Sequence, residues 1–246
     1  MTKILVPFDF SEQAQNALNF STAIADKFDY VHIEVLHVME TPTSTTMGTM
    51  GGGEMMPDME NQIFFIELMN RRKVQIEELK AKYADSNFTF SANIKLGNAF
   101  KGISESISEA NPDLVIMGSK GSSGVEEVLI GSNTEKVVRT AICPVITIKS
   151  AVDPKDLKKI VFASDFREYN VEIADGMKRL QNLLGAQLYF VVINTPGIIE
   201  FADDVNADLI AMITHGRTGF LHLITGSIAE DVVNHATRPV WTFKTK

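Results

Sequence analysis

An internal repeat constrains the fold of this chain more than any other feature of the sequence. The stretch TKILVPFDF at 2–10 resembles KKIVFASDF at 158–166, an offset of 156 residues. The stretch GSNTEKVVRTAICPVITIK at 131–149 resembles GSIAEDVVNHATRPVWTFK at 226–244, an offset of 95 residues. Two halves built on one plan therefore follow each other in the chain.

The change of offset locates a difference between the halves. The offset falls from 156 to 95, a difference of 61 residues. The second half therefore lacks 61 positions that the first half has, at about Glu40–Lys101. Either the second half is a reduced domain, or the sequence as given omits a segment. We therefore expect one domain at 1–150 and a second, shortened or incompletely recorded domain at 151–246.

Short β-branched runs alternate with longer amphipathic segments in the first half, which is typical of strands linked by helices. The predicted strands are Ile4–Phe8, Val31–Val38, Phe88–Ile94, Leu114–Met117 and Val145–Ile148. The predicted helices cover 11–28, with Ser11 as N-cap, 61–83 and 99–110. This alternation predicts an α/β fold, a parallel sheet with helices on both faces, whose ligands bind beyond the carboxyl ends of the strands.

Composition excludes several classes of function. With 45% hydrophobic residues the 246-residue chain can bury a sizeable core, and its net charge of −8 argues against nucleic acid and anionic membrane as partners. No run of about 18 apolar residues and no signal peptide is present, so we expect a cytoplasmic protein. The single cysteine, Cys143, permits no internal disulfide and is expected to be a buried, inert thiol.

The stretch MGSKGSSGVEEVLIGS at 117–132 has two interpretations. Glycines let backbone amides approach a phosphate closely, so Gly118, Gly121 and Gly131 with Ser132 could form an anion site at the start of a helix. Alternatively, Ser132 and the glutamate three residues later form a capping box, which needs no ligand. The spacing matches neither a P-loop nor the usual dinucleotide fingerprint.

Asp9 ends the first predicted strand, at the edge of the sheet where ligands are expected. Its carboxylate could accept hydrogen bonds from an adenine amine or from ribose hydroxyls. It could instead cap the helix that follows.

The stretches VPFDFSEQA, DLVIMGSKG and GSNTEKVVRTAICPVITIK together resemble the universal stress protein family, in its tandem form. This resemblance implies two Rossmann-like domains, similar to adenine nucleotide alpha hydrolases, with five parallel strands each and ATP, with or without Mg²⁺, at the carboxyl edge. The family's nucleotide-binding members carry G-x2-G-x9-G-(S/T), which this chain matches. The candidate ATP-binding residues are then Pro7, Asp9, Val38, Met117, Gly118, Gly121, Gly131, Ser132 and Asn133.

The resemblance also implies that family members pair through their last strands, so PVITIK and PVWTFK could pair within one chain, and a homodimer is a further expectation. Ile213 stands where the first half has Gly118. A β-branched side chain obstructs a close backbone approach, so we expect the second half to be a partner domain without ATP.

Other candidate chemistries are weaker. His215 and His222 lack the neighbouring ligands of a metal site, and the methionine-rich segment 41–60 is expected to be a lid or a partner-binding loop. No nucleophile–base pair is evident, so we expect no catalytic residues and no metal. We therefore predict a nucleotide-binding stress-response regulator with an unidentified protein partner. A slow ATPase or adenylate-handling enzyme, and an interaction module with an empty site, are the alternatives.

Overall fold

Strands and helices alternate along the chain. The computed structural model describes residues 2–26, 30–41, 59–120, 130–164, 171–191, 197–215 and 225–245. The elements of the first half are β1 (Thr2–Pro7), α1 (Glu12–Ala25), β2 (Val31–Met39), α2 (Met59–Lys82), β3 (Thr89–Leu96), α3 (Ala99–Ala110), β4 (Leu114–Gly118), α4 (Ser132–Thr140) and β5 (Val145–Ile148). Those of the second half are β6 (Lys159–Ala163), α5 (Val171–Leu184), β7 (Gln187–Val191), α6 (Ile198–Asp204), β8 (Leu209–His215), α7 (Thr225–His235) and β9 (Val240–Thr245). The strands and helices predicted for the first half are present, with ends shifted by a few residues.

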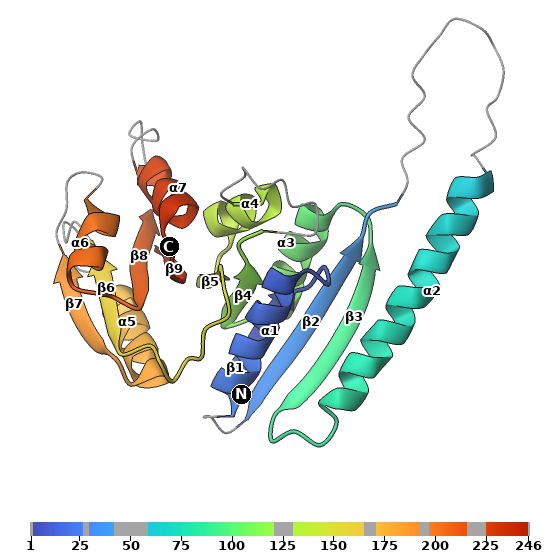
Figure 1. Ribbon diagram of the computed structural model, residues 1–246, viewed down its shortest axis with the longest axis horizontal. Coiled ribbons are helices and arrows are strands. Elements are labelled where there is room, and N and C mark those ends of the chain that lie inside the picture. The colour runs from blue at the N-terminus through green and yellow to red at the C-terminus, as the bar shows by residue number, and fades with distance from the viewer. Residues whose placement is uncertain are drawn as a thin grey trace, which may run out of the picture.

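The nine strands of the described residues form one sheet, in the order β3-β2-β1-β4-β5-β9-β8-β6-β7. Figure 1 shows that the strands of the first half form one end of this sheet, with α2 outermost, and that the strands of the second half form the other end. Neighbouring strands are parallel within each half, as the alternation of strands and helices predicts. The expected α/β fold with helices around a mainly parallel sheet is therefore confirmed.

The two halves meet through β5 and β9, which pair antiparallel. The contact is symmetric: the Thr147 hydroxyl donates to the Val240 carbonyl at 3.2 Å, and the Thr242 hydroxyl donates to the Val145 carbonyl at 3.3 Å. The expected pairing of PVITIK with PVWTFK is thus present. Because these strands run in opposite directions, the carboxyl ends of the two halves lie at opposite edges of the sheet.

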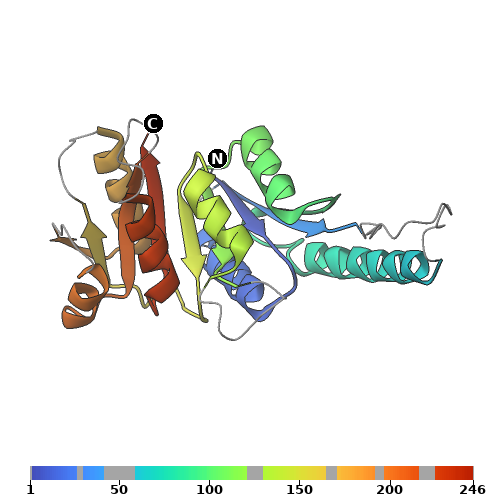
Figure 2. The ribbon, with the colours of Figure 1, turned by 90° about the horizontal axis from the view of Figure 1, so that it is seen from above.

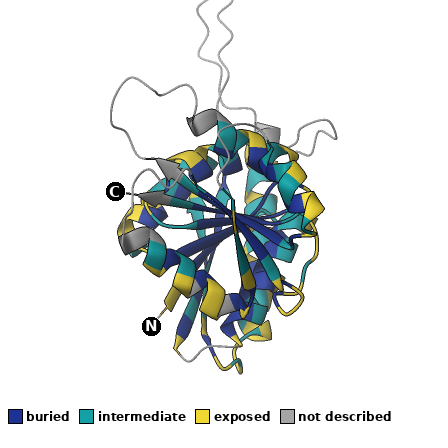
Figure 3. Ribbon diagram, turned by 90° about the vertical axis from the view of Figure 1, so that its left-hand side faces the viewer, coloured by how far each residue is buried: buried dark blue, intermediate teal, exposed yellow. Residues whose placement is uncertain are grey.

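Apolar side chains on both faces of the sheet form two cores. Helices α1, α2 and α5 cover one face, and α3, α4, α6 and α7 cover the other. Figure 2 shows helices on both sides of the strands, and Figure 3 shows the strands buried in the middle with exposed residues on the outer sides of the helices. The central strands β4 and β5 are buried on both faces, which explains why their sequences are continuous apolar runs.

No helix among the described residues has the length and hydrophobicity that crossing a bilayer requires.

The reduction of the second half removes one helix and one strand. Only residues 192–197 separate β7 from α6, at the place where the first half has α2 and β3. In the first half β3 is the edge strand, and α2 lies against it. An edge strand pairs with one neighbour only, so a sheet can lack it without losing the hydrogen bonds between its other strands. In the second half β7 is therefore the edge strand of the sheet.

Candidate functional site

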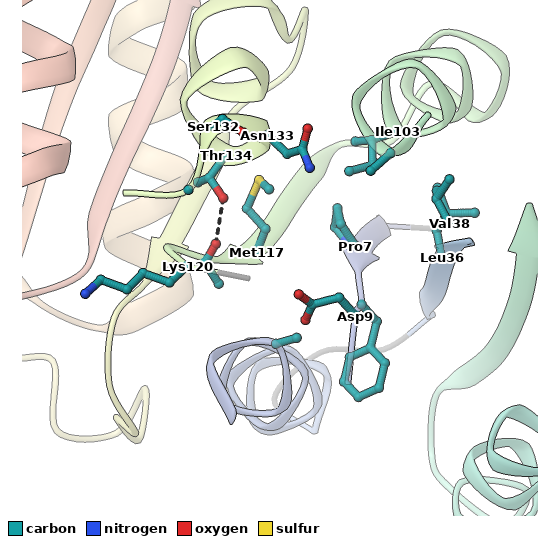
Figure 4. Close-up of a pocket in the computed structure, with 15 residues that line it drawn as sticks. Pro7, Asp9, Leu36, Val38, Ile103, Met117, Lys120, Ser132, Asn133 and Thr134 are labelled. Atoms are coloured by element: carbon teal, nitrogen blue, oxygen red, sulfur yellow. Dashed lines mark hydrogen bonds between the residues drawn. The ribbon is translucent and has the colours of Figure 1, made fainter. Parts of the chain in front are cut away.

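A pocket opens at the carboxyl ends of β1, β2 and β4, where the connections diverge to opposite faces of the sheet. The first residues of α3 and α4 close its other side. Figure 4 shows the carboxylate of Asp9 and the side chain of Asn133 around the space that Pro7 and Met117 border. The lining residues are Pro7, Phe8, Asp9, Ala14, Leu36, Val38, Ala99, Ile103, Met117, Gly118, Lys120, Gly131, Ser132, Asn133 and Thr134.

Asp9 lies in the tight connection between β1 and α1. Its Oδ1 accepts a hydrogen bond from the Ser11 N–H at 3.0 Å, and the Ser11 hydroxyl accepts one from the Ala14 N–H at 3.2 Å. Ser11 is therefore the N-cap of α1, as predicted. The alternative that Asp9 caps this helix is wrong, because the carboxylate lies outside the first helical turn and lines the pocket.

Gly118, the last residue of β4, allows α1 to approach the sheet very closely. A β-carbon at this position would lie 2.8 Å from the backbone carbon of Gln13 and 3.0 Å from the backbone nitrogen of Ala14. Real β-carbons do not come this close to backbone atoms, so any other residue would displace α1. The glycine is thus required by the packing of α1, whatever occupies the pocket.

The N-terminus of α4 faces the pocket without a side-chain cap. The predicted capping box is wrong: Ser132 is the first helical residue, and the N-cap is Gly131, which makes no side-chain hydrogen bond. Glu135 instead lies 3.8 Å from Arg139, one turn along the helix. The first N–H groups of α4 have no partner within the helix, which makes this end a favourable position for an anion.

Two hydrogen bonds fix the start of α4 to the end of β4. The Thr134 hydroxyl donates to the Gly118 carbonyl at 2.9 Å, and the Gly131 N–H donates to the Ser119 carbonyl at 2.7 Å. Thr134 and Ser119 are both buried. The helix terminus therefore has a defined position relative to the strand edge.

A second close approach shapes the apolar wall of the pocket. A β-carbon on Gly102 of α3 would lie 2.9 Å from Cγ2 of Val38. The glycine lets α3 lie against Val38, and Ile103 beside it also lines the pocket. Gly102 therefore controls where the Val38 side chain can stand.

Of the nine candidate residues, eight line this one pocket: Pro7, Asp9, Val38, Met117, Gly118, Gly131, Ser132 and Asn133. The ninth, Gly121, lies outside the described residues. Thr134 and Lys120 also line the pocket and are not among the residues predicted from the sequence. Thr134 carries no spacing signal, whereas Lys120 adjoins the glycine motif and was detectable. Its ammonium group points away from Asp9 (Figure 4).

His37 and Cys143 are among the titratable groups outside the lining whose pKa values are shifted. Burial lowers the pKa of His37, while its hydrogen bond to the Phe8 carbonyl opposes that shift. Partial burial also raises the pKa of the Cys143 thiol to about 11, in agreement with the inert thiol that was predicted, although Cys143 is half-buried and not fully buried as expected. Among the described residues no group of three potential ligands could hold a metal ion. Most of the segment 41–60, and also His222, lie outside the described residues.

Comparison with known proteins gives consistent matches over both halves. A family model described as the universal stress protein family matches residues 1–149 and 190–244. A universal stress protein of Methanocaldococcus jannaschii is 30% identical over 153 residues, which cover 60% of this chain and 94% of that protein. Another, from Bacillus subtilis, is 27% identical over 151 residues, covering 60% of this chain and 98% of its own. The crystal structure of a universal stress protein from Archaeoglobus fulgidus has a TM-score of 0.74 at 18% identity and covers 98% of both chains, so its likeness extends to the fold of the shortened half.

Proposed function

The chain belongs to the universal stress protein family, and we propose that it is a stress-response regulator whose first half binds ATP. Its role is to change a surface for a protein partner when nucleotide binds, without committed catalysis. The family supports the stress-response role. The pocket supports the choice of ligand.

The observation that carries this proposal is the start of α4. Its N-terminal N–H groups have no side-chain cap, and two hydrogen bonds hold this end beside the pocket. Such a terminus favours phosphate because aligned backbone N–H groups and the helix dipole both act on the anion. The net charge of −8 is no obstacle, since backbone amides supply the attraction.

The remaining lining suits the adenosine part. Val38, Ile103 and Met117 provide apolar surface for a base, and Asp9 provides a carboxylate acceptor for hydroxyl or amine groups. A ligand with an apolar ring, hydroxyls and a polyphosphate matches these three features in one molecule. Mg²⁺ would enter with the phosphates, because the described residues offer no cluster of ligands for it.

The test separates the phosphate from the adenosine. Ser132→Asp places a carboxylate at the exposed first position of α4, where it stabilises the helix but repels phosphate. By titration calorimetry we expect this variant to bind ATP about tenfold more weakly than the parent protein, or more weakly still. Its affinity for adenosine should stay within about threefold of the parent value. The matched control is Ser227→Asp in the second half, which should leave both affinities unchanged.

Two results would contradict the proposal. One is the absence of any ATP binding by the folded parent protein, which would favour an interaction module with an empty site. The other is an unchanged ATP affinity in Ser132→Asp. Sustained formation of ADP that is lost in Asp9→Asn would instead support the slow ATPase, and a phosphate-release assay on the same samples measures it.

A further inference from the structure

Residues Phe8, Asp9 and Phe10 form the connection that presents Asp9 to the pocket, and its backbone is unusual. Phe10 has a φ of 65°, in the left-handed region that a bulky residue seldom occupies. This conformation costs free energy, so contacts around the ring must stabilise it. The contacts come from the face of the sheet opposite the pocket.

His37 is the first of these contacts. Its Nδ1 lies 2.7 Å from the Phe8 carbonyl oxygen, and its ring meets the Phe10 ring edge to face at a centroid distance of 4.9 Å. Phe8 and Phe10 are also edge to face, at 4.9 Å. His37 thus touches the residues on both sides of Asp9.

Arg72 of α2 is the second contact. Its guanidinium lies over the Phe10 ring, 4.2 Å from the centroid, which is favourable for a cation–π interaction. The ring is therefore held between the guanidinium on one side and His37 and Phe8 at its edges. Asp9 also acts electrostatically on Arg72: burial and Arg71 lower the pKa of the guanidinium, while Asp9 raises it.

We infer that Arg72 is a positioning residue for the nucleotide site: through Phe10 it holds the connection at 8–10 in the conformation that places the Asp9 carboxylate at the pocket. The inference rests on the proposed function for its effect on affinity. It gives α2 a role in the site although no α2 residue lines the pocket. It also gives one reason to expect a different strand edge in the half whose described residues include no counterpart of α2.

The test is a double-mutant cycle followed by ATP titration. Arg72→Ala removes the cation, and the buried Ile76 keeps α2 on the sheet. Phe10→Asn removes the ring but suits the left-handed conformation, which asparagine adopts readily. We expect Arg72→Ala to weaken ATP binding about tenfold, Arg72→Lys to restore most of the affinity, and the exposed neighbour variant Arg71→Ala to change it less than about twofold.

The cycle distinguishes positioning from a general structural effect. In the Phe10→Asn background, Arg72→Ala should weaken ATP binding less than about twofold further, because its route to Asp9 is already gone. Independent effects of the two substitutions would overturn the inference, and so would an Arg72→Ala variant that binds ATP as the parent does.

A readout without nucleotide keeps the two proposals separable. The ¹³C shift of the Asp9 carboxyl group should change in Arg72→Ala and remain unchanged in Arg71→Ala. If the parent protein binds no ATP but this pattern appears, the proposed function fails and the positioning contact stands. An Asp9 shift that is the same in the parent and Arg72→Ala overturns the contact.

Discussion

The two halves differ at one matched position beside the strand edge, Gly118 at the end of β4 and Ile213 in β8. Gly118 lets the first turn of α1 lie directly on the strand, with Gln13 within 3.0 Å of where a β-carbon would stand. Ile213 instead carries a side chain that packs against the core, and α5 makes its strand contacts chiefly with β9. Among the described residues, α5 thus makes no approach to β8 comparable with that of α1 to β4.

A second difference is the loss of an element. The first half has α2, whose Arg72 contacts the connection after β1, whereas the second half passes from β7 to α6 through residues 192–197. The halves therefore keep the strands that pair at the centre and differ in the parts that surround the strand ends. A repeated fold can thus preserve the sheet while the segments around the strand ends diverge.

The largest effect is expected when Gly118 of the first half is replaced by isoleucine, the residue at the matched position of the second half. Gly118→Ile forces α1 away from β4, so the free energy of unfolding should fall by about 3 kcal/mol or more, and ATP binding should be lost. Urea unfolding and calorimetry measure both. The reverse change, Ile213→Gly, should cost about 2 kcal/mol without creating a second site. A Gly118→Ile variant with parental stability would refute the packing argument.

The matched aspartates provide the next comparison. Asp165 corresponds to Asp9 at the offset of 156. Asp9→Asn removes a charged acceptor at the pocket and should reduce ATP affinity roughly ten- to hundredfold, whereas Asp165→Asn should change it less than about twofold. Equal losses in both variants, measured by calorimetry, would mean that the halves bind alike.

Cys143 and Arg238 also occupy matched positions, and only the arginine supports a helix end. Its guanidinium donates to the Ala202 and Ala207 carbonyls at 2.7 and 2.6 Å and pairs with Asp203. Arg238→Cys leaves these carbonyls without the donor, so the free energy of unfolding should fall by about 2 kcal/mol.

Arg139→Ala is the control for that change, because Arg139 forms an exposed pair at 3.8 Å whose loss should cost less than about 0.5 kcal/mol. Similar effects of the two substitutions on urea midpoints would show that the Arg238 contacts contribute little.

The smallest effect concerns the junction of the halves. The Lys149 ammonium donates to the Asn234 carbonyl in the last turn of α7 at 2.8 Å, and burial, with a further contribution from Lys120, lowers its pKa to about 8. Between pH 8 and the ordinary value of 10.5 the unfolded chain holds a proton that the folded chain has lost, so stability should rise with pH in this window.

Lys149→Met should reduce that rise, and the matched variant Lys244→Met should leave it unchanged. Unfolding free energies at several pH values between 7.5 and 10.5 measure the slope. An identical slope in the parent and Lys149→Met would show that this lysine titrates normally.

The sequence predicted the strands and most of the pocket because both leave local patterns. The apolar runs indicate which segments are buried, and the glycine spacing selected Gly118 and Gly131, which both line the pocket. The spacing did not predict why these residues occupy their positions. Gly118 is needed for the close packing of α1, and Ser132 is the first residue of α4 and not its N-cap. Such distinctions depend on distances between elements that periodicity does not encode.

The contact between Arg72 and Phe10 could not be predicted from the sequence, for a related reason. The two residues are far apart in the chain, and the predicted helix around Arg72 indicated only that one of its faces is buried. Which side chain meets which depends on how α2 lies over the sheet. The positive φ of Phe10 could not be predicted either, because phenylalanine seldom adopts this conformation.

The most direct test of the central claim, that one half holds the site, is the stoichiometry of ATP binding to the parent protein. Titration calorimetry of the full chain with Mg²⁺ and ATP should give a single site per chain. Two sites per chain would contradict the account, because the half with Ile213 would then bind as well. The absence of binding would contradict it as a whole.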